Sequence, residues 1–566
     1  MDFSKSPSGK STRQSILHAI VDLHSHVVFR RSEPSSLEVR VHFALSKLSS
    51  RHRHRSQISF AVFYSAMDST IPSNTPALSY APEDGAIVLH SSSSSSSSGH
   101  SPSESIDEKE TPPPSVKEIE FKVDPEALPP KTGTTATRYL KHNFFSAYRR
   151  IFATIFFANL ATLIALCVVN KGAPSAAQVG AAASANLMLT SLFRQEEFVN
   201  ILYEIAVACP LSFPLAIRRR LATVFHYGGA HSGFGTAAVT WYLLYTALAT
   251  KDFVQTHNRN QIPNIVTSYI LVLMFCFILG AAHPKFRVRY HDHFEMMHRY
   301  SGWVAMVTFW VHIVTASRVY AEMEGTTTGL YMVKSSNFWT FLVSTCCLIL
   351  SWSRLRCRKV YPEVLSDHAI RLHFKYTDMA PFYGVKISSS PVKEWHAFAT
   401  IPDVDEATGK RKGFSVVVSN AGDWTKETIM NPPTQLWVRG APLHGLLFTS
   451  KLFRRIVVVA TGSGIGPCLS LLHADYTPRR VLWSTPHPET TYGPKILNAV
   501  LKADPKAVVW NTRTQGRPDM VALTYALVLE AQAEAVFIIS NPKVTRKVVY
   551  GMNSRGIAAF GAIFDS

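Results

Sequence analysis

Two histidines, His298 and His312, lie fourteen positions apart in the largely apolar segment HDHFEMMHRYSGWVAMVTFWVH, residues 291–312. On an α-helix fourteen residues rise about 21 Å and turn about 1400°, so both rings point within about 40° of one direction. Buried imidazoles near the two surfaces of a hydrocarbon layer roughly 30 Å thick are suited to axial ligation of stacked haems. We therefore expect intramembrane electron transfer, provided that other segments supply the missing ligands.

The second ligands must lie at the same depth on a facing helix. His226 and His231 stand near the start of the third apolar segment, level with His298 if both helices run in the same direction. Fourteen residues further on, this segment has Thr240 and Tyr245 instead of histidine. The sequence therefore predicts one b-type haem held by His298 and His231, with His226 as the alternative ligand. His312 is expected either to form hydrogen bonds between helices or to ligate iron with an unrecognised partner.

A glycine-rich turn lies further along the chain, in RRIVVVATGSGIGPCLSLL, between an apolar strand and a helix. Gly462, Gly464 and Gly466, followed by Pro467, would let the backbone approach a pyrophosphate that rests on the helix N-terminus. A purely structural turn is the alternative interpretation, and the flanking strand and helix argue against it. The turn therefore predicts a nicotinamide nucleotide as a bound partner.

The choice between NADH and NADPH depends on the residues that meet the ribose. The next predicted strand, VLWSTP, ends in Ser484 and Thr485 and has no acidic residue to bind a ribose 2′-hydroxyl. Arg517, in the segment GRPD, and Arg513 are candidates for contacting a 2′-phosphate, although either can equally be a solvated surface charge. This pattern favours NADPH.

The chain has 566 residues and a formal net charge of +19, yet only 17% of its residues are charged and 46% are hydrophobic. Its basic residues gather beside apolar segments, which is typical of a membrane protein and argues against nucleic acid as a partner. The seven cysteines form no CxxC pair, so we expect buried thiols rather than a disulfide framework or a zinc site.

Six apolar segments are predicted to cross a lipid bilayer. They are 151–169, 176–193, 229–249, 264–282, 298–316 and 336–352. A further segment, 199–216, contains two prolines and is expected to be interfacial or re-entrant. Lysine and arginine are concentrated at alternate ends of the six segments, so the positive-inside rule predicts that both termini are cytoplasmic. The identity of the membrane stays open.

Changes in composition divide the chain into four predicted regions. Residues 1–135 are rich in serine and proline and are expected to be disordered. The first 66 of them resemble a transit peptide in composition, or form an extension upstream of an internal start. Residues 136–353 contain the predicted six-helix transmembrane bundle. Short strands over 354–447 predict a small antiparallel β-barrel, and alternating strands and helices over 448–566 predict an α/β domain with a parallel sheet.

From about residue 140 to its end, the chain resembles the ferric reductase and NADPH oxidase superfamily. In that family, haem-binding helices precede a ferredoxin-reductase-like module for FAD and NAD(P)H. The segment with the two spaced histidines is similar to the family's fifth helix, and GSGIGP to its nicotinamide-nucleotide loop. The nearest resemblance is to transmembrane flavoproteins of the TmpA type, which are related to the tails of adenylate-forming reductases.

Two further motifs carry the resemblance into the predicted barrel. EWHAFATIP is similar to the family's flavin motif, which implies that His396 and Phe398 contact the isoalloxazine ring. Ala399 stands where the family has a hydroxyl near flavin N5, so Thr400 is the candidate substitute. SNAGDWTKETI is similar to the GDWT segment of the family's FAD barrel. The FAD-binding residues that it implies are Gly422, Asp423, Trp424 and Thr425.

The resemblance implies a membrane-bound oxidoreductase that passes electrons from NAD(P)H through FAD to an intramembrane haem and on to an unidentified acceptor. Two alternatives stay open. The first is a regulatory flavin-binding membrane protein with little turnover, because Ala399 lacks the usual hydroxyl and Ser540 replaces the family's cysteine near the nicotinamide. The second is a transporter-like six-span protein with a decayed nucleotide domain, in which the histidines and Arg194 line a polar path.

Overall fold

A computed structural model describes most of the second half of the chain and parts of the first. The described residues are 26–31, 37–42, 128–405, 408–474 and 476–562. The chain forms two compact units, 1–108 and 109–566. In the first unit, β1 (His26–Arg31) and β2 (Leu37–His42) form an antiparallel hairpin. The predictions of disorder and of a targeting segment over residues 1–135 fall largely outside the described residues, and all candidate site residues belong to the second unit.

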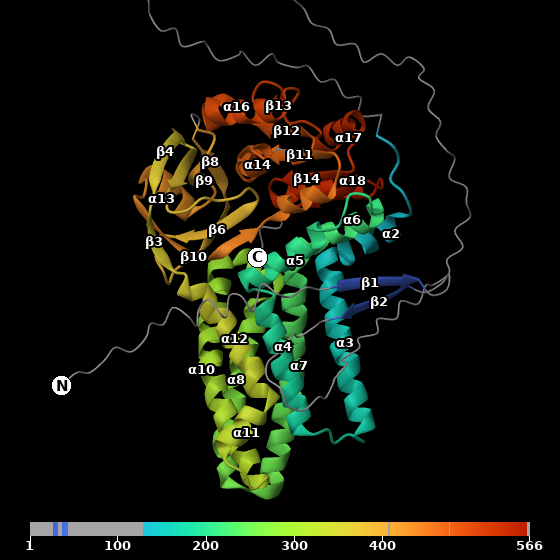
Figure 1. The fold of residues 1–566 in the computed structure, drawn as a ribbon, viewed down its shortest axis with the longest axis vertical. Coiled ribbons are helices and arrows are strands. Elements are labelled where there is room, and N and C mark those ends of the chain that lie inside the picture. The colour runs from blue at the N-terminus through green and yellow to red at the C-terminus, as the bar shows by residue number, and fades with distance from the viewer. Residues whose placement is uncertain (1–25, 32–36, 43–127, 406–407, 475, 563–566) are drawn as a thin grey trace, which may run out of the picture. The chain divides into compact units, whose positions relative to one another are not determined.

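The second unit begins with a helical region in which long helices run side by side (Figure 1). Its longest members are α3 (Ala147–Val169), α4 (Ala176–Leu192), α7 (Gly228–Thr256), α8 (Ile262–Ala281), α10 (His291–Met323) and α12 (Ser336–Ser353). Helix α7 packs against both α3 and α4, and α10 packs along α8. The shorter helices between them are α5 (Glu196–Val207), α6 (Leu215–Leu221), α9 (Pro284–Arg289) and α11 (Thr328–Lys334).

The predicted six-helix transmembrane bundle is wrong. In the described part of the chain three helices are long and apolar enough to cross a membrane, or four if the bent pair α11 and α12 is one span. The three are Ala147–Val169, Arg259–Ala281 and His291–Met323. Helix α4 has only 17 residues, and α7 is interrupted by glycine, serine, threonine and two charged residues. Its small residues serve packing instead, because a side chain at Gly229 or Gly233 would press against α3.

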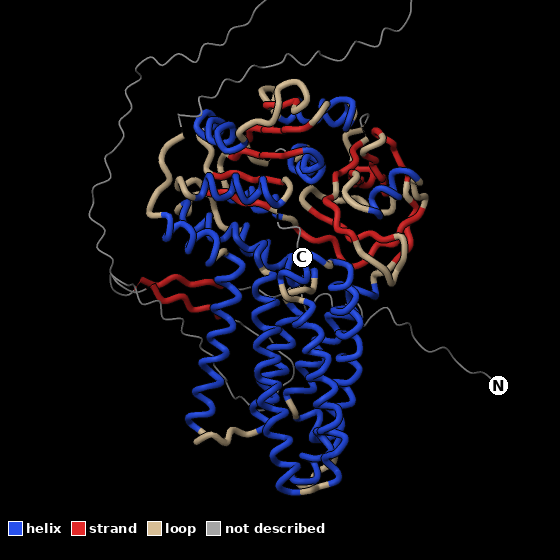
Figure 2. The backbone as a smooth tube through the Cα atoms, turned by 180° about the vertical axis from the view of Figure 1, so that it is seen from behind, coloured by secondary structure: helices blue, strands red, loops and turns tan. Residues whose placement is uncertain are grey.

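The predicted antiparallel β-barrel is also wrong, because the strands between residues 356 and 444 form two separate antiparallel sheets of four strands each (Figure 2). The first has the order β3 (Arg356–Lys359), β10 (Gln435–His444), β6 (Tyr383–Ser388), β7 (His396–Ala399). The second has the order β4 (Tyr361–Ser366), β5 (Ala369–Phe374), β9 (Arg411–Ser419), β8 (Ile401–Val404). Ile387 and Leu436 of the first sheet share one apolar core with Leu372, Phe414 and Val416 of the second.

A five-stranded parallel sheet follows, as the alternation of strands and helices predicts. Its order is β13 (Val508–Asn511), β12 (Arg479–Thr485), β11 (Ile456–Thr461), β14 (Ala535–Ile539), β15 (Ala558–Gly561). Strand β11 is a continuous run of buried apolar residues, as expected for a strand covered on both faces. Helices α14 (Ile465–Leu472) and α16 (Pro494–Ala503) pack in one core, and α17 (Met520–Ala531) and α18 (Pro542–Asn553) pack in the other.

A buried ion pair joins the helical region to the parallel sheet. Only 3% of the Arg218 side chain, on α6, is exposed. Its two terminal nitrogens donate to the two carboxylate oxygens of Glu534 at 2.7 and 3.0 Å, and one also donates to the carbonyl of Leu452 at 2.7 Å. Glu534 directly precedes β14, so the pair fixes α6 against the start of a central strand.

We expect Arg218→Ala to lower the stability of the second unit by about 3 kcal/mol, because it leaves a partly buried carboxylate without its partner. The matched control is Arg220→Ala, at an exposed position two residues further along α6. Thermal unfolding of both variants measures the difference. Equal melting temperatures would show that the pair does not hold the helices against the sheet.

Candidate nucleotide, flavin and haem sites

The glycine-rich loop lies at the point where the order of the parallel sheet reverses. Strands β11 and β14 are neighbours in the sheet and lead outward to helices on opposite faces. At their carboxyl ends, the hydroxyls of Thr461 and Ser540 are hydrogen-bonded to each other. Ligands of open α/β sheets bind in the crevice outside such a reversal. The structure therefore places the predicted nucleotide loop where this fold class binds nucleotides.

One glycine of the loop serves packing. A Cβ atom at Gly464 would overlap the carbonyl oxygen of Ile539, so this glycine lets α14 approach β14. A Cβ atom at Gly466 would lie 3.4 Å from Val417 of β9, which is an ordinary van der Waals contact. Loss of activity on enlarging Gly464 would consequently report a packing defect, and not only a lost approach to pyrophosphate.

The start of the loop is the part that solvent reaches. Gly462 has a φ of +51°, and its carbonyl accepts a hydrogen bond from Trp483 Nε1 at 3.1 Å. Ser463 is exposed, and Pro467 lies in the first turn of α14, where its missing N–H has no helical partner to lose. Ser463 is thus the position at which a side chain can be changed without disturbing the core.

The arginines predicted to meet a 2′-phosphate lie in the loop that leaves β13. Arg513 and Arg517 are both exposed. The loop between them is held by Trp510 Nε1, which donates to the carbonyl of Gly516 at 2.9 Å. Because the sheet is parallel, this loop shares the carboxyl edge with the glycine-rich loop. The two arginines stay candidates for binding that phosphate.

The residues of the flavin motif gather around Trp424. The ring of His396, on β7, stacks on Trp424 with centroids 4.2 Å apart, and Phe398 is 6.0 Å from the same indole. Trp424 Nε1 donates to Ser389 Oγ at 2.8 Å. The gap between His396 and Trp424 is too small for a third ring, so an isoalloxazine would have to lie against the outer surface of this group.

The hydroxyl of Thr400 does not fit the role predicted for it. Thr400 is fully buried between β7 and β8, and its hydroxyl donates to the carbonyl of Tyr383 at 2.9 Å. This hydrogen bond is used to carry the chain from one antiparallel sheet to the other. The sequence could not reveal that the Thr400 hydroxyl is turned inward, because the pairing of distant strands decides which of Ala399 and Thr400 faces the core.

The GDWT segment forms the start of helix α13 (Asp423–Met430), with Gly422 before it. The Thr425 hydroxyl accepts hydrogen bonds from the backbone N–H groups of Ala421 and Gly422, each at 2.9 Å. Asp423 stands at the first helical position and is exposed. Thr425 therefore shapes the turn. Asp423 faces outward, and Trp424 packs against the His396 ring.

Of the four candidate haem ligands, His231 and His298 face each other. Their ring centroids are 6.4 Å apart and their planes differ by 29°. The Nδ1 atom of His231 lies 2.9 Å from the carbonyl of Thr190, which fixes this nitrogen as the donor and leaves Nε2 free to ligate. His226 instead packs on Phe225, with centroids 4.0 Å apart.

His312 lies in a different environment, further along α10. Its Nδ1 is 3.0 Å from Thr267 Oγ1 and its Nε2 is 3.4 Å from the hydroxyl of Tyr242. Those partners belong to α8 and α7, so His312 forms hydrogen bonds between helices, which was one of its two predicted roles. A second haem does not fit here, because the Tyr242 hydroxyl lies where iron would have to approach Nε2.

Helix α10 also contacts the flavin motif. Arg299, next to His298, donates to the carbonyls of Val392 and Lys393 at 2.8 and 2.6 Å. Burial lowers the pKa of His396, and the nearby carboxylates of Glu394 and of Asp292, in the first turn of α10, partly oppose this shift. The same helix therefore positions one candidate haem ligand and supports the loop that leads into β7.

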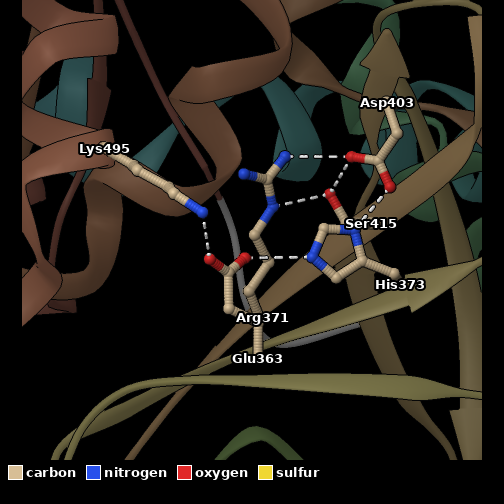
Figure 3. Close-up of polar contacts among 6 residues, drawn as sticks. All are labelled: Glu363, Arg371, His373, Asp403, Ser415 and Lys495. Carbon is tan, nitrogen blue, oxygen red and sulfur yellow. Dashed lines mark hydrogen bonds and ion pairs between the residues drawn. The ribbon is translucent and has the colours of Figure 1, made fainter. Parts of the chain in front are cut away.

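A polar network on the second antiparallel sheet was missed by the sequence analysis (Figure 3). His373 lies between Asp403 and Glu363, at 2.6 and 3.0 Å, and Arg371 contacts Asp403 at 3.0 Å. Lys495, on α16 of the parallel-sheet region, donates to Glu363 at 2.8 Å. The available signal was the alternation of Arg371 and His373 with buried apolar residues along β5. Pairing with strands far away in sequence gave those side chains their partners.

The charges of this network are mutually stabilising. The hydrogen bond to Asp403 raises the pKa of His373. Burial raises the pKa of Asp403, but the hydrogen bonds and charges of its neighbours, with His373 foremost, bring it below its usual value. Burial also raises the pKa of Glu363, but the hydrogen bonds from Lys495 and His373 bring it below its usual value. The network therefore links the second antiparallel sheet to the parallel-sheet region through Glu363, which contacts both His373 and Lys495.

Comparison with known proteins gives matches to adenylate-forming reductases. A family model described as the C-terminal domain of adenylate-forming reductase 03009 matches residues 446–566. Adenylate-forming reductase 03009 of Coprinopsis cinerea is 45% identical over 438 residues, which is 77% of this chain and 42% of that protein. Adenylate-forming reductase 06235 of the same organism is 43% identical over 441 residues, which is 78% and 42% of the two chains. The chain spans less than half the length of these relatives. The predicted relation to the tails of adenylate-forming reductases is confirmed, and the resemblance to the haem-binding helices of the ferric reductase superfamily stays a prediction.

Solved structures give weaker similarity. A ferredoxin NADP+ reductase from Neisseria gonorrhoeae with bound FAD and NADP aligns over 37% of this chain and 98% of its own, with 15% identity and a TM-score of 0.30. A flavohemoglobin from Malassezia yamatoensis with bound FAD and heme aligns over 68% of this chain and 98% of its own, with 13% identity and a TM-score of 0.32. Both scores are low, so the functional argument rests on this chain's own residues and on its sequence relatives.

We expect His373→Gln to lower stability by about 1 kcal/mol at about pH 6 and by much less at about pH 8.5. The pKa of His373 is raised above 6.5, so the protonated imidazole stabilises the fold fully below that value. This contribution is lost as pH rises through the folded-state pKa. Thermal melts at both pH values measure the effect, with the exposed His293→Gln as the control. A destabilisation that does not change with pH would contradict an ionised His373.

Proposed function

We propose that this chain is an oxidoreductase that transfers electrons from NAD(P)H, with NADPH favoured, to FAD and on to one b-type haem. The observation that carries the proposal is the position of α10. Arg299 holds the loop before the flavin motif, and its neighbour His298 faces His231. The sequence relatives are named reductases, which supports this class of activity. The electron acceptor stays unidentified.

The separation of His231 and His298 fits one iron atom. With each nitrogen about 2 Å from the metal, two imidazoles on opposite sides of one iron have centroids about 6 Å apart. The observed separation is 6.4 Å. In the described residues no group of three or more His, Cys, Asp or Glu side chains could hold a metal ion, so iron here would take its other ligands from a porphyrin. A bound haem supplies reversible one-electron transfer.

This chain's own residues perform the binding and orientation. The carbonyl of Thr190 orients His231 through Nδ1, and helix α10 carries His298 at the same level. Ser463 and the N-terminus of α14 offer backbone N–H groups to a pyrophosphate. His396 and Trp424 present a rigid stacked pair against which a flavin ring can pack. Arg517 is the proposed contact for a 2′-phosphate.

We also propose that the protein is held in a lipid bilayer by its three or four candidate spans. Large apolar side chains point outward from them, with Phe157 61%, Leu273 51% and Val307 67% exposed. The sheets belong on the cytoplasmic side, since the basic residues of the segments flanking the helices gather there. The backbone of Thr132, before α3, is hydrogen-bonded to Ser554 of the parallel-sheet region, which puts the start of α3 on the same side.

Removal of a haem ligand gives a direct test. We expect the purified full-length protein to show flavin absorption together with a Soret band, and both His298→Ala and His231→Ala to lose the Soret band but keep the flavin. His226→Ala is the matched control and should keep both. A pyridine haemochrome assay should give one haem per chain. Two haems per chain, or a full Soret band in His298→Ala, would overturn the haem assignment.

The nucleotide loop can be tested by charge at its exposed position. We expect Ser463→Glu to raise KM for NADPH about tenfold, because a carboxylate there repels the pyrophosphate, while the rate of flavin reduction at saturation changes little. Ser463→Gln has nearly the same shape without the charge and should behave like the unmodified protein. Stopped-flow reduction of the flavin measures both. The same KM in the two variants would show that no pyrophosphate binds at this loop.

A further inference from the structure

Arg439, on β10, is held between two tryptophans. Its guanidinium carbon lies 4.6 Å from the ring centroid of Trp352, at the end of α12, and 4.6 Å from that of Trp395, which directly precedes β7. The planar guanidinium is suited to stacking on aromatic faces. The stack therefore fixes one positive charge between the helical region and the start of the flavin motif.

The charge of Arg439 has no carboxylate of its own. Glu196 and Glu295 are the acidic groups whose charges reach it. Both are already paired, the first with Lys386 at 3.0 Å and the second with Arg299. Burial lowers the pKa of Arg439 to about 10, so the guanidinium remains ionised at neutral pH. In this group of described residues three cations face two carboxylates, which leaves one positive charge uncompensated.

Three neighbouring side chains here have a buried nitrogen without a hydrogen-bond partner among the described residues. They are Arg439 at Nε, Trp395 at Nε1 and His396 at Nε2. Arginine and tryptophan can only donate hydrogen bonds, so the surroundings of the flavin motif lack an acceptor or a negative charge. Buried donors are normally paired in folded proteins, and an unpaired one is a sign of a missing group.

The charge also lies close to the place proposed for the flavin. Arg439 of β10 is paired with Lys386 of β6, which is paired in turn with Ala397 of β7. Neighbouring strands are about 4.8 Å apart, so the backbone of Arg439 lies about 10 Å from the strand that carries the motif. Its side chain extends toward Trp395, which shortens this separation. A flavin ring packed against His396 is within range of the charge, because buried charges are screened much less than exposed ones.

We propose that Arg439 sets the reduction potential of the flavin by stabilising its reduced, anionic form. A hydride from NAD(P)H, transferred to flavin N5, leaves NAD(P)+ and a reduced ring whose negative charge is shared by N1 and the neighbouring carbonyl oxygen. A fixed cation favours that charge over the uptake of a further proton, and charge near the ring is one means by which a protein tunes a flavin. This inference rests on the proposed function, because it requires FAD at the His396 motif.

Removal of the charge tests the inference in the full-length protein reconstituted with FAD. We expect Arg439→Met to lower the equilibrium constant for two-electron reduction of the flavin at least tenfold, a shift of about 30 mV. Arg439→Lys keeps the charge and should retain most of the effect. Arg411→Met, at an exposed position on β9 of the other antiparallel sheet, is the matched control and should leave the constant unchanged. Equilibration with a dye of known potential, followed by absorption, measures all four proteins.

Proton uptake gives a second measurement that needs no variant. The pH dependence of the midpoint potential counts the protons taken up with the electrons. We expect the bound flavin to take up one proton with two electrons at a pH where free FAD in the same buffer takes up two. An unchanged potential in FAD-loaded Arg439→Met, or equal proton uptake by bound and free flavin at every pH, would overturn the proposal. Absence of FAD binding by the unmodified protein would instead contradict the proposed function, and this inference with it.

Discussion

The buried carboxylate of Glu196 is the constraint on which the arrangement of the second unit depends. It stands at the start of α5, only 2% exposed, and contacts Lys386 of β6 at 3.0 Å and the hydroxyl of Ser351 near the end of α12. A Cβ atom at Gly440 of β10, where φ is +75°, would lie 2.6 Å from its oxygen. A charge so enclosed is stable only with its partners in place, so two helices and two strands are fixed at one point.

That fixed point determines how the candidate sites relate to one another. Helix α5 lies along β10, and Asn200 bonds to the carbonyl of Pro442 and to the N–H of His444 at 2.8 and 2.9 Å. At the far side of the same sheet, Arg299 of α10 holds the loop that precedes the flavin motif. The flavin motif and the facing pair His231 and His298 are thus parts of one packed framework, and electron transfer between them would need no large motion.

The helical region exposes apolar side chains outward and keeps one group of polar side chains hydrogen-bonded to one another inside. Helices α3, α8 and α10 expose large apolar side chains outward, whereas His312, Thr267 and Tyr242 bond to one another inside. In place of the outer haem site that the histidine spacing suggested, the protein has this hydrogen-bonded group.

The sequence by itself determined the features that depend on local pattern. The glycine-rich turn between β11 and α14, the parallel sheet, and the facing of His231 and His298 follow from glycine positions, strand alternation and helical spacing. It could not determine the number of spans, because helix α7 has enough length but exchanges apolar residues for small ones that serve packing. Only the tertiary structure showed that the antiparallel strands form two sheets, that Thr400 is turned inward, and that Gly464 makes room for Ile539. Each of these depends on contacts between residues far apart in the chain, which no local pattern encodes.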